Sequence, residues 1–275
     1  MPSQMNDLFD QIHKLPQIAE VIRVIINQLS DPNAAMQDVA KNVEKEQVVA
    51  LKILRLVNSA HFGLSRKISS IEEATSLLGA NQLKTLVIAS GIVSAIPNIP
   101  NFDIKQFWNN SFRSATVAKW FAEQASLSGD IAYTAGLISN LGNLLIHMGA
   151  QREANEIDQH VKSGSSRIEI ERRRLGYTSL EVTAELCRRW KFADELIETI
   201  EHCGEPLLEQ ASSLSAAVYL GRYISLCHDQ NKSYDEIAED FPLSVANKLG
   251  LTTEFIVEKL TEVLAIESNL VSLAD

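Results

Sequence analysis

The sequence has few of the features that mark secreted or membrane-spanning proteins. It contains three cysteines, Cys187, Cys203 and Cys227, without CxxC spacing, a pattern that favours reduced thiols over a disulfide framework. No uninterrupted apolar run approaches the ~18 residues of a transmembrane helix. The N-terminal segment has early acidic residues and no apolar core of a signal peptide. We therefore expect a cytoplasmic protein that does not span a membrane.

Basic charge is also scarce. The 25 Lys and Arg residues are outnumbered by 35 Asp and Glu residues, which gives a formal net charge of -10 and an isoelectric point near 5.2. General binding to nucleic acid or to an anionic membrane needs a basic face, so we expect neither. The sequence also lacks a P-loop, a GxGxxG after a strand, a GxSxG and zinc-knuckle spacing. No cofactor is expected.

Glycine and proline are few, at 12 and 7 residues, whereas apolar residues make up 45 % of the chain. Apolar positions recur at three- and four-residue spacing, as in "QIAEVIRVIINQL", and no useful alternating pattern indicates a strand. Ser70 with Glu73, and later Asp103, are predicted helix caps. The segment "PNIPNF" is the best candidate linker. These signals predict an all-α protein with an N-terminal helical subdomain over 1–97 and a larger helical bundle over 103–275.

The helix predicted after the linker, "DIKQFWNNSFRSATVAKWFAEQA", carries several large apolar side chains. Aromatic residues supply much of the buried area of a core. We therefore expect four of its residues in the core: Phe107, Trp108, Val117 and Phe121. The following stretch "AGLISNLG" (135–142) consists of small and apolar residues, with Ser139 and Asn140 at its centre.

A series of motifs resembles the HDOD family. In chain order these are "LPQIAEVI", "LKILRLVNSAHFG", "ISSIEEATSLLGANQLKTL", "FWNNS", "AGLISNLG" and "ERRRLGYTSLEVTAELCRRW", and the resemblance covers about residues 15–206. HDOD domains are degenerate relatives of the HD and HD-GYP phosphohydrolases and are associated with bacterial signal transduction. The resemblance implies a multi-helical HD-like bundle.

The resemblance also implies where metal ligands of an HD enzyme would fall. A first His matches a position near Asn110, and the His-Asp pair matches Ser139 and Asn140. A later His falls near Ser179, and a His-His pair falls on Cys203 and Gly204, with His202 one place early. Neutral Asn and Ser are weak donors toward a divalent cation. The resemblance therefore implies a vestigial polar pocket without metal or catalysis, formed by Asn110, Ser139, Asn140, Ser179, His202 and Cys203.

The distribution of histidine leads to the same expectation without reference to the family. The six histidines stand at 13, 61, 147, 160, 202 and 228, and no two are three to five residues apart, as helical ligand pairs commonly are. The dipeptide His228-Asp229 follows an apolar helix and is expected at a helix end, in contact with solvent.

Three other features are assigned structural roles. Asn58, in "NSAHFG" (58–63), is expected to hydrogen-bond a helix end. Cys187 and Cys227 are expected to be small buried apolar groups. Cys203 is not expected to be redox-active, because Glu201 and Glu205 beside it would not stabilise a thiolate. The run "ERRR" (171–174) is expected to be a solvated helical face paired with Glu169 and Glu171.

The resemblance favours a non-catalytic signalling or regulatory module that acts through protein–protein contacts, with signalling proteins as partners. Two alternatives stay open. The first is a metal-dependent phosphohydrolase acting on nucleotides or cyclic dinucleotides, with another ligand set such as His147, His202 and nearby acids. The second is a nucleotide-sensing module that uses the degenerate pocket. No pattern in the sequence specifies the oligomeric state.

Overall fold

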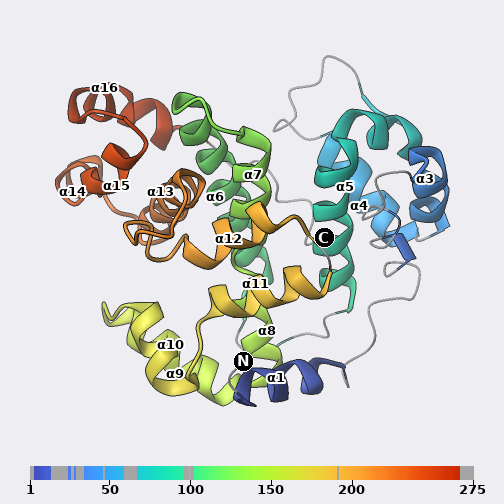
Figure 1. Ribbon diagram of the computed structural model, residues 1–275, viewed down its shortest axis with the longest axis horizontal. Coiled ribbons are helices and arrows are strands. Elements are labelled where there is room, and N and C mark those ends of the chain that lie inside the picture. Colours follow the sequence, from blue (N-terminus) through green and yellow to red (C-terminus); the bar gives the residue numbers. More distant parts are fainter. Residues whose placement is uncertain are drawn as a thin grey trace. The chain divides into compact units, whose positions relative to one another are not determined.

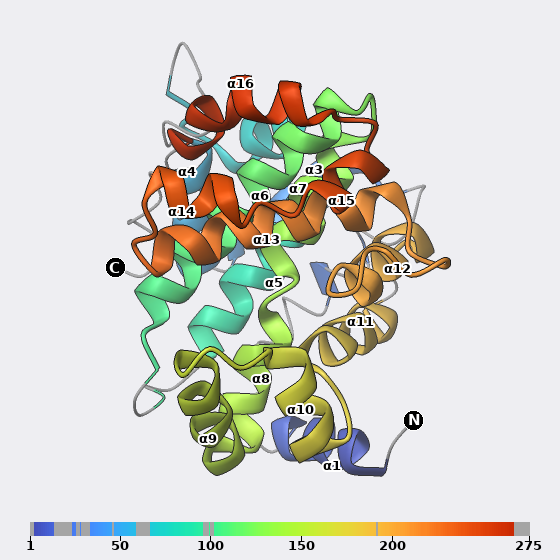
Figure 2. The same cartoon turned by 90° about the vertical axis from the view of Figure 1, so that its left-hand side faces the viewer.

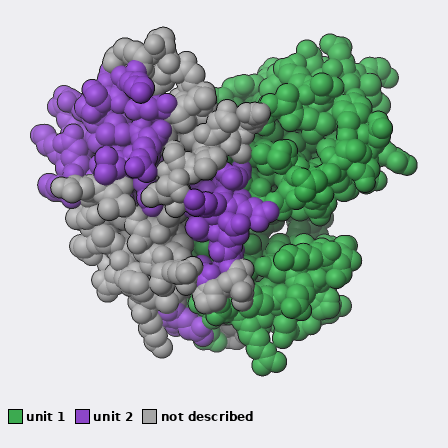
Figure 3. Space-filling view, turned by 180° about the vertical axis from the view of Figure 1, so that it is seen from behind, with its two compact units in different colours: residues 1–9, 110–268 green, residues 10–109, 269–275 purple. Residues whose placement is uncertain are grey.

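The computed structural model describes residues 3–13, 24–25, 28, 34–45, 47–58, 67–95, 99, 102–190 and 192–266. It separates into two compact units (Figure 3). Unit 1 comprises residues 1–9 and 110–268, and unit 2 comprises residues 10–109 and 269–275. Each unit is described by itself below.

The described residues confirm the predicted all-α class (Figures 1 and 2). The described residues are predominantly helical, and none of them lies in a strand. None of the described helices is both long and apolar enough to cross a bilayer. The helices in the first part of the chain are α1 (Ser3–His13), α3 (Met36–Lys45), α4 (Gln47–Val57), α5 (Ile71–Ala95) and α6 (Ile104–Gln124).

The remaining helices belong to unit 1 and are mostly short. Several begin at the side-chain caps that Ser and Thr form most readily, and Thr178 and Ser233 head complete capping boxes. The helices are α7 (Gly129–Ile138), α8 (Leu141–Gly149), α9 (Gln151–Lys162), α10 (Arg167–Leu175), α11 (Ser179–Arg189), α12 (Asp194–His202), α13 (Ser213–Asp229), α14 (Tyr234–Glu239), α15 (Leu243–Lys248) and α16 (Thr253–Leu264).

Unit 2 is a small bundle in which α3, α4 and α5 pack against one another (Figure 1). Its core includes Val39, Ile53 and Leu83, all fully buried. Gly79 interrupts α5 with a φ of 70°, a left-handed conformation that favours glycine. Asn58 joins the end of α4 to the next segment, because its side chain bonds the carbonyl of Leu54 and both backbone polar groups of Ile68. The predicted helix-end role of Asn58 is thereby confirmed.

Unit 1 is organised around α13, which packs against α7, α12 and α15 (Figure 2). Small residues permit close approach of the backbones. A Cβ on Gly136 of α7 would lie 2.7 Å from the Cα of Ala115, and one on Gly221 of α13 would lie 2.4 Å from the carbonyl oxygen of Ser114. Both neighbours belong to α6, so α6, α7 and α13 form a tightly packed centre.

The core residues predicted on α6 are confirmed. Phe107, Trp108, Val117 and Phe121 are buried, with Trp108 only 1 % exposed. The predicted cap at Asp103 is also present, because its carboxylate accepts the backbone N–H of Gln106 at 2.9 Å.

The compact units do not coincide with the predicted segments 1–97 and 103–275. The division falls between residues 109 and 110, inside α6, and residues 1–9 belong to unit 1. The reason is tertiary packing: Leu8 lies against Gly149, and the Arg189 guanidinium lies 4.1 Å from the centre of the Phe9 ring. Most of the predicted helix over 17–29, the "SAHFG" part of the 58–63 motif and most of the predicted linker lie outside the described residues.

Candidate functional site

Ser139 and Asn140, the positions that match the His-Asp pair, form the junction between α7 and α8. Ser139 is the fully buried C-cap of α7, and its hydroxyl donates to the carbonyl of Gly136 at 3.1 Å. Asn140 is the N-cap of α8, but its side chain makes no capping hydrogen bond. Its amide is therefore available for a contact outside the helix.

That contact is made by Arg222 of α13. Its Nη1 donates to the Ser139 hydroxyl at 2.9 Å and to Asn140 Oδ1 at 2.7 Å. The same guanidinium acts electrostatically on Cys203, where burial raises the pKa of the thiol and the Arg222 charge opposes that rise. A protein cation thus lies against the two residues that the resemblance matches to the His-Asp pair.

Sequence reasoning did not identify Arg222. The available signal was a lone cation, because Arg222 is the only Lys or Arg in the 17-residue α13, whose remaining residues are largely apolar. Nothing local connects it with Ser139, which is 83 positions away in the chain. Only the packing of α7 against α13 brings the two residues together.

The other residues predicted for the pocket have separate contacts. Cys203, the fully buried C-cap of α12, donates its thiol to the carbonyl of Ile200 at 3.2 Å. His202 is the last residue of α12 and is half-buried. The backbone carbonyl of Asn110 accepts a hydrogen bond from Ser225 at 2.9 Å. That bond connects the backbone of Asn110, not its side chain, to α13. A pocket shared by all six residues stays a prediction.

Ser179 is connected to the junction through the backbone. The hydroxyl of Thr183 accepts the N–H of Gly142 at 2.8 Å and lies 3.0 Å from the carbonyl oxygens of both Ser139 and Ser179. A Cβ on Gly142 would lie 1.8 Å from the Ser179 carbonyl oxygen. The start of α8 therefore contacts α11 at backbone distance, and Thr183 provides the hydrogen bonds there.

The hydroxyl of Ser179 points to a different polar cluster. Both its N–H and its Oγ donate to Glu171, at 2.7 and 3.0 Å. Glu171 is 1 % exposed, and burial raises the pKa of its carboxyl despite the opposing charge of Arg167 and the bonds from Ser179. The prediction that Glu171 belongs to a solvated face is therefore wrong, because α10 turns this residue toward α11. The neighbouring arginines do form surface ion pairs: Arg172 pairs with Glu205, and Arg174 pairs with Glu156.

Arg167 extends this cluster across α8, α9 and α10. It donates to Asp158 at 2.5 Å and to the Asn143 side chain at 3.0 Å, and lies 3.5 Å from Glu171. Asp158 also bonds the buried His147 ring at 2.9 Å. Burial alone would raise the pKa of Asp158, but the bond with His147 and the charge of Arg167 lower it to about 2. The arrangement is a satisfied structural network, in which His147 and its acid neighbour are already engaged.

Asp158→Asn is expected to lower the free energy of unfolding by about 1–2 kcal/mol at neutral pH. The pKa of Asp158 is lower in the folded protein than the ordinary value of 3.8, so its stabilisation is present above pH 4 and is lost as the pH falls through 2. Urea unfolding of both proteins between pH 7 and pH 2 measures this difference. The gap should shrink below pH 4, whereas the exposed control Glu209→Gln should show no comparable gap. A gap independent of pH contradicts the role of Asp158.

The predicted burial of Cys187 and Cys227 and the predicted helix-end position of His228-Asp229 are confirmed. Cys187, Cys203 and Cys227 are all buried free thiols. His228 and Asp229 close α13 and are exposed. Within the described part of the chain, no group of three or more His, Cys, Asp or Glu side chains is placed to hold a metal ion.

The sequence of the chain matches the family model of the HDOD domain over residues 15–206. This protein belongs to the HDOD family. An uncharacterized protein of Treponema pallidum is 25 % identical over 202 residues, which cover 70 % of this chain and 38 % of that protein. The uncharacterized protein YuxH of Bacillus subtilis is 37 % identical over 60 residues, or 22 % of this chain and 15 % of YuxH. The chain thus spans well under half the length of these two relatives.

Solved structures show the same fold over nearly the whole chain. The crystal structure of a "Putative phosphohydrolase" from Shewanella amazonensis is 25 % identical, with a TM-score of 0.73 and 98 % of both chains covered. An HDOD domain protein with unknown function from Geobacter sulfurreducens is 21 % identical, with a TM-score of 0.71 and the same coverage. A "Putative signal transduction protein" from Marinobacter aquaeolei is 19 % identical with a TM-score of 0.68, and covers 99 % of this chain and 66 % of its own. The HD-like helical fold of this HDOD protein is thereby confirmed.

Proposed function

We propose that this HDOD protein is a non-catalytic, cytoplasmic signalling module that acts through contacts with other proteins. The observation that carries the proposal is the bonding of Ser139 and Asn140 to Arg222. A divalent ion at this junction would have to exchange its hydration shell for neutral oxygens beside a guanidinium, and like charges repel. Without a metal, nothing in the junction activates water for phosphoester hydrolysis. What the scaffold still offers is its surface.

The names of two structurally similar proteins bear on this proposal in different ways. The Marinobacter protein is named for signal transduction, which supports a signalling role. The Shewanella protein is named as a phosphohydrolase, which corresponds to the alternative function. For this chain, that alternative would need a metal site built from other residues. His147, one of the histidines considered for it, is already bonded to Asp158 and to the Asn143 carbonyl.

The purified protein is expected to show no metal-dependent turnover of cyclic dinucleotides or generic phosphodiesters with manganese, iron or magnesium. Ser139→His with Asn140→Asp is expected not to restore hydrolysis. The carboxylate introduced at position 140 would pair with Arg222, as carboxylates beside guanidinium groups do, and the other ligand positions would stay empty. Product release measured by chromatography, with elemental analysis of the protein, tests both statements.

A matched variant separates the two reasons for inactivity. Adding Arg222→Ala to the double variant removes the competing cation. The other positions that match metal ligands still carry residues that bind metal poorly. Tighter manganese binding by this triple variant than by the double variant would support competition by Arg222. Turnover by the wild-type protein that disappears with a chelator and follows the protein through purification would overturn the non-catalytic proposal.

The nucleotide-sensing alternative has one observation in its favour. Among the described residues, Arg222 makes its hydrogen bonds through Nη1 alone, and neither acceptor is a carboxylate. Its remaining N–H groups could accept a phosphate as a charge-assisted partner. A ligand that binds only the folded state raises the melting temperature. Melting curves with inorganic phosphate, nucleotides and cyclic dinucleotides, repeated with Arg222→Gln, therefore test this second function.

A further inference from the structure

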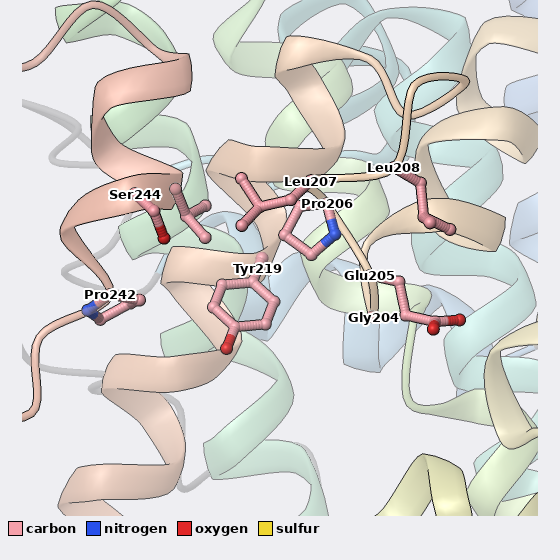
Figure 4. Close-up of a pocket in the computed structure, with 9 residues that line it drawn as sticks. Gly204, Glu205, Pro206, Leu207, Leu208, Tyr219, Pro242 and Ser244 are labelled. Atoms are coloured by element: carbon pink, nitrogen blue, oxygen red, sulfur yellow. The ribbon is translucent and has the colours of Figure 1, made fainter.

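A shallow pocket of about 350 Å³ lies on unit 1, and Gly204 is among its lining residues. Its lining includes Pro206 and two leucines from the segment after α12, Tyr219 of α13, and Pro242 and Val245 at α15. Figure 4 shows the Tyr219 ring between Pro242 on one side and the Gly204–Leu208 segment on the other. We call this feature the 207–245 groove.

The wall formed by residues 206–211 is fixed by a single lysine. The ammonium group of Lys248 donates to the carbonyl of Pro206 at 2.7 Å, to that of Leu208 at 3.3 Å and to that of Ala211 at 2.6 Å. Three bonds use the full donor capacity of a lysine. The ammonium therefore satisfies the backbone of this segment and is not available to a ligand in the groove.

The fixed segment holds two adjacent apolar side chains in solvent. Leu207 is 57 % exposed and Leu208 is 40 % exposed, whereas the Pro206 side chain beside them is buried. Other exposed apolar residues of unit 1, such as Leu226 and Val257, stand singly, as is normal for a protein surface. An adjacent leucine pair beside a concavity is the arrangement that an apolar anchor of a partner fits.

The chain segments that form the groove are strongly acidic. Residues 194–209 contain six Asp or Glu and no Lys or Arg, and residues 234–248 contain four Asp or Glu and one basic residue, Lys248. Lys248 is bonded to the three carbonyls, so it faces the segment that it fixes. Of the acids, Glu205 is paired with Arg172, Glu201 with Arg188 and Asp240 with Lys232. Glu209 is exposed and has no ion pair among the described residues. The exposed carboxylate of Glu209, next to Leu208 in the chain, can therefore attract a cationic group of a partner at the edge of the groove.

We propose that the 207–245 groove docks a basic amphipathic helix of a partner protein. Aliphatic residues on one face of that helix would cover Leu207 and Leu208, and Lys or Arg residues on its flanks would face the acids around the groove. Amphipathic helices bind apolar grooves through apolar side chains spaced three or four residues apart on one face. Complementary charge speeds and orients the encounter of the two proteins. The proposal rests on the proposed function, because it assigns a surface to its protein contacts.

The test uses the full chain and two labelled helical peptides of about 15 residues. One carries leucine on one face and lysine on the other, and the second has glutamate in place of lysine. Fluorescence anisotropy is expected to show binding of the lysine peptide, weakened by added salt, and much weaker binding of the glutamate peptide. Leu207→Ser with Leu208→Ser should weaken binding of the lysine peptide by about tenfold or more.

The matched control is Leu226→Ser with Val257→Ser, which removes two exposed apolar side chains elsewhere on unit 1 and should change affinity less than about twofold. Equal affinity for the wild-type protein and both double variants would overturn the proposal, because the peptide would then be adsorbed by charge alone. Absence of binding to the wild-type protein would also overturn it. Self-association of the wild-type protein that the Leu207/Leu208 variant abolishes would overturn the choice of partner in favour of a second copy.

A charge-reversal variant keeps the test valid if the leucine variant fails to fold. Glu209→Lys should lower the affinity for the lysine peptide by several-fold, whereas Glu169→Lys on the exposed face of α10 should change this affinity little. No difference between these two variants would contradict the proposal. Loss of the groove proposal leaves the non-catalytic function untouched, since that function fails only on metal-dependent turnover.

Discussion

Gly142→Ala is expected to destabilise the protein by at least about 3 kcal/mol, or to prevent folding, because its Cβ has no space. The new carbon would lie 1.8 Å from the Ser179 carbonyl oxygen and 2.9 Å from the Thr183 hydroxyl. The first neighbour is backbone, so α8 and α11 would have to separate. That separation would also break the bond from the Gly142 N–H to Thr183. Thermal and urea unfolding followed by circular dichroism measure the effect.

Gly129→Ala is the control for Gly142→Ala. Gly129 is the first residue of α7, and the three atoms nearest to a Cβ there all belong to the flexible side chain of Glu123. Alanine costs less conformational entropy than glycine in a helix, so this variant should be neutral or slightly stabilising. If Gly142→Ala proved as stable as Gly129→Ala, the close contact between α8 and α11 would be contradicted.

Trp108→Ala is expected to lower the free energy of unfolding by about 3–5 kcal/mol. Trp108 is 1 % exposed and is the largest of the fully buried side chains. Its ring lies edge-on to Phe107, with ring centres 5.2 Å apart. Truncation removes this apolar area and leaves a cavity that the surroundings can fill only in part. The midpoint of urea unfolding is the quantity to measure.

The comparison for Trp108 is Trp120→Ala on the same helix. Trp120 is only half-buried, stacks on Phe255 and bonds Glu262 through its indole N–H at 3.3 Å. Because water already reaches this ring, its loss should cost about 1–2 kcal/mol. A cost below about 1 kcal/mol for Trp108→Ala would show an exposed ring and would make Trp108 a candidate for partner binding.

Local signals in the sequence account for much of the secondary structure. The spacing of apolar residues predicts helices because one face of each must be buried, and this pattern repeats within every few residues. The caps at Asp103 and Ser70 follow the same logic, since each bonds a backbone N–H three positions later. The burial of the four large side chains on α6 is likewise predictable, because their type and spacing already select the inner face.

The sequence also determined what the candidate junction lacks. Ser139 and Asn140 stand at the positions that match the His-Asp pair, and both are poor metal ligands. The HDOD resemblance indicated the family and its helical fold. The first inference depends on residue identity at two positions, and the second depends on motifs spread over residues 15–206. Neither requires knowledge of which helices touch.

Only the tertiary structure decided which residue contacts Ser139 and Asn140 and where the chain divides. Arg222 reaches Ser139 across 83 positions, and Glu171 of α10 is buried against Ser179 of α11. The first part of α1 joins unit 1 through contacts at Gly149 and Arg189. The groove beside Leu207 exists because Lys248 fixes a segment some 40 positions earlier in the chain. The physical reason is common to all four. Local patterns record which face of a helix is apolar, but the partner of a polar or charged side chain is set by helix packing between residues distant in the chain.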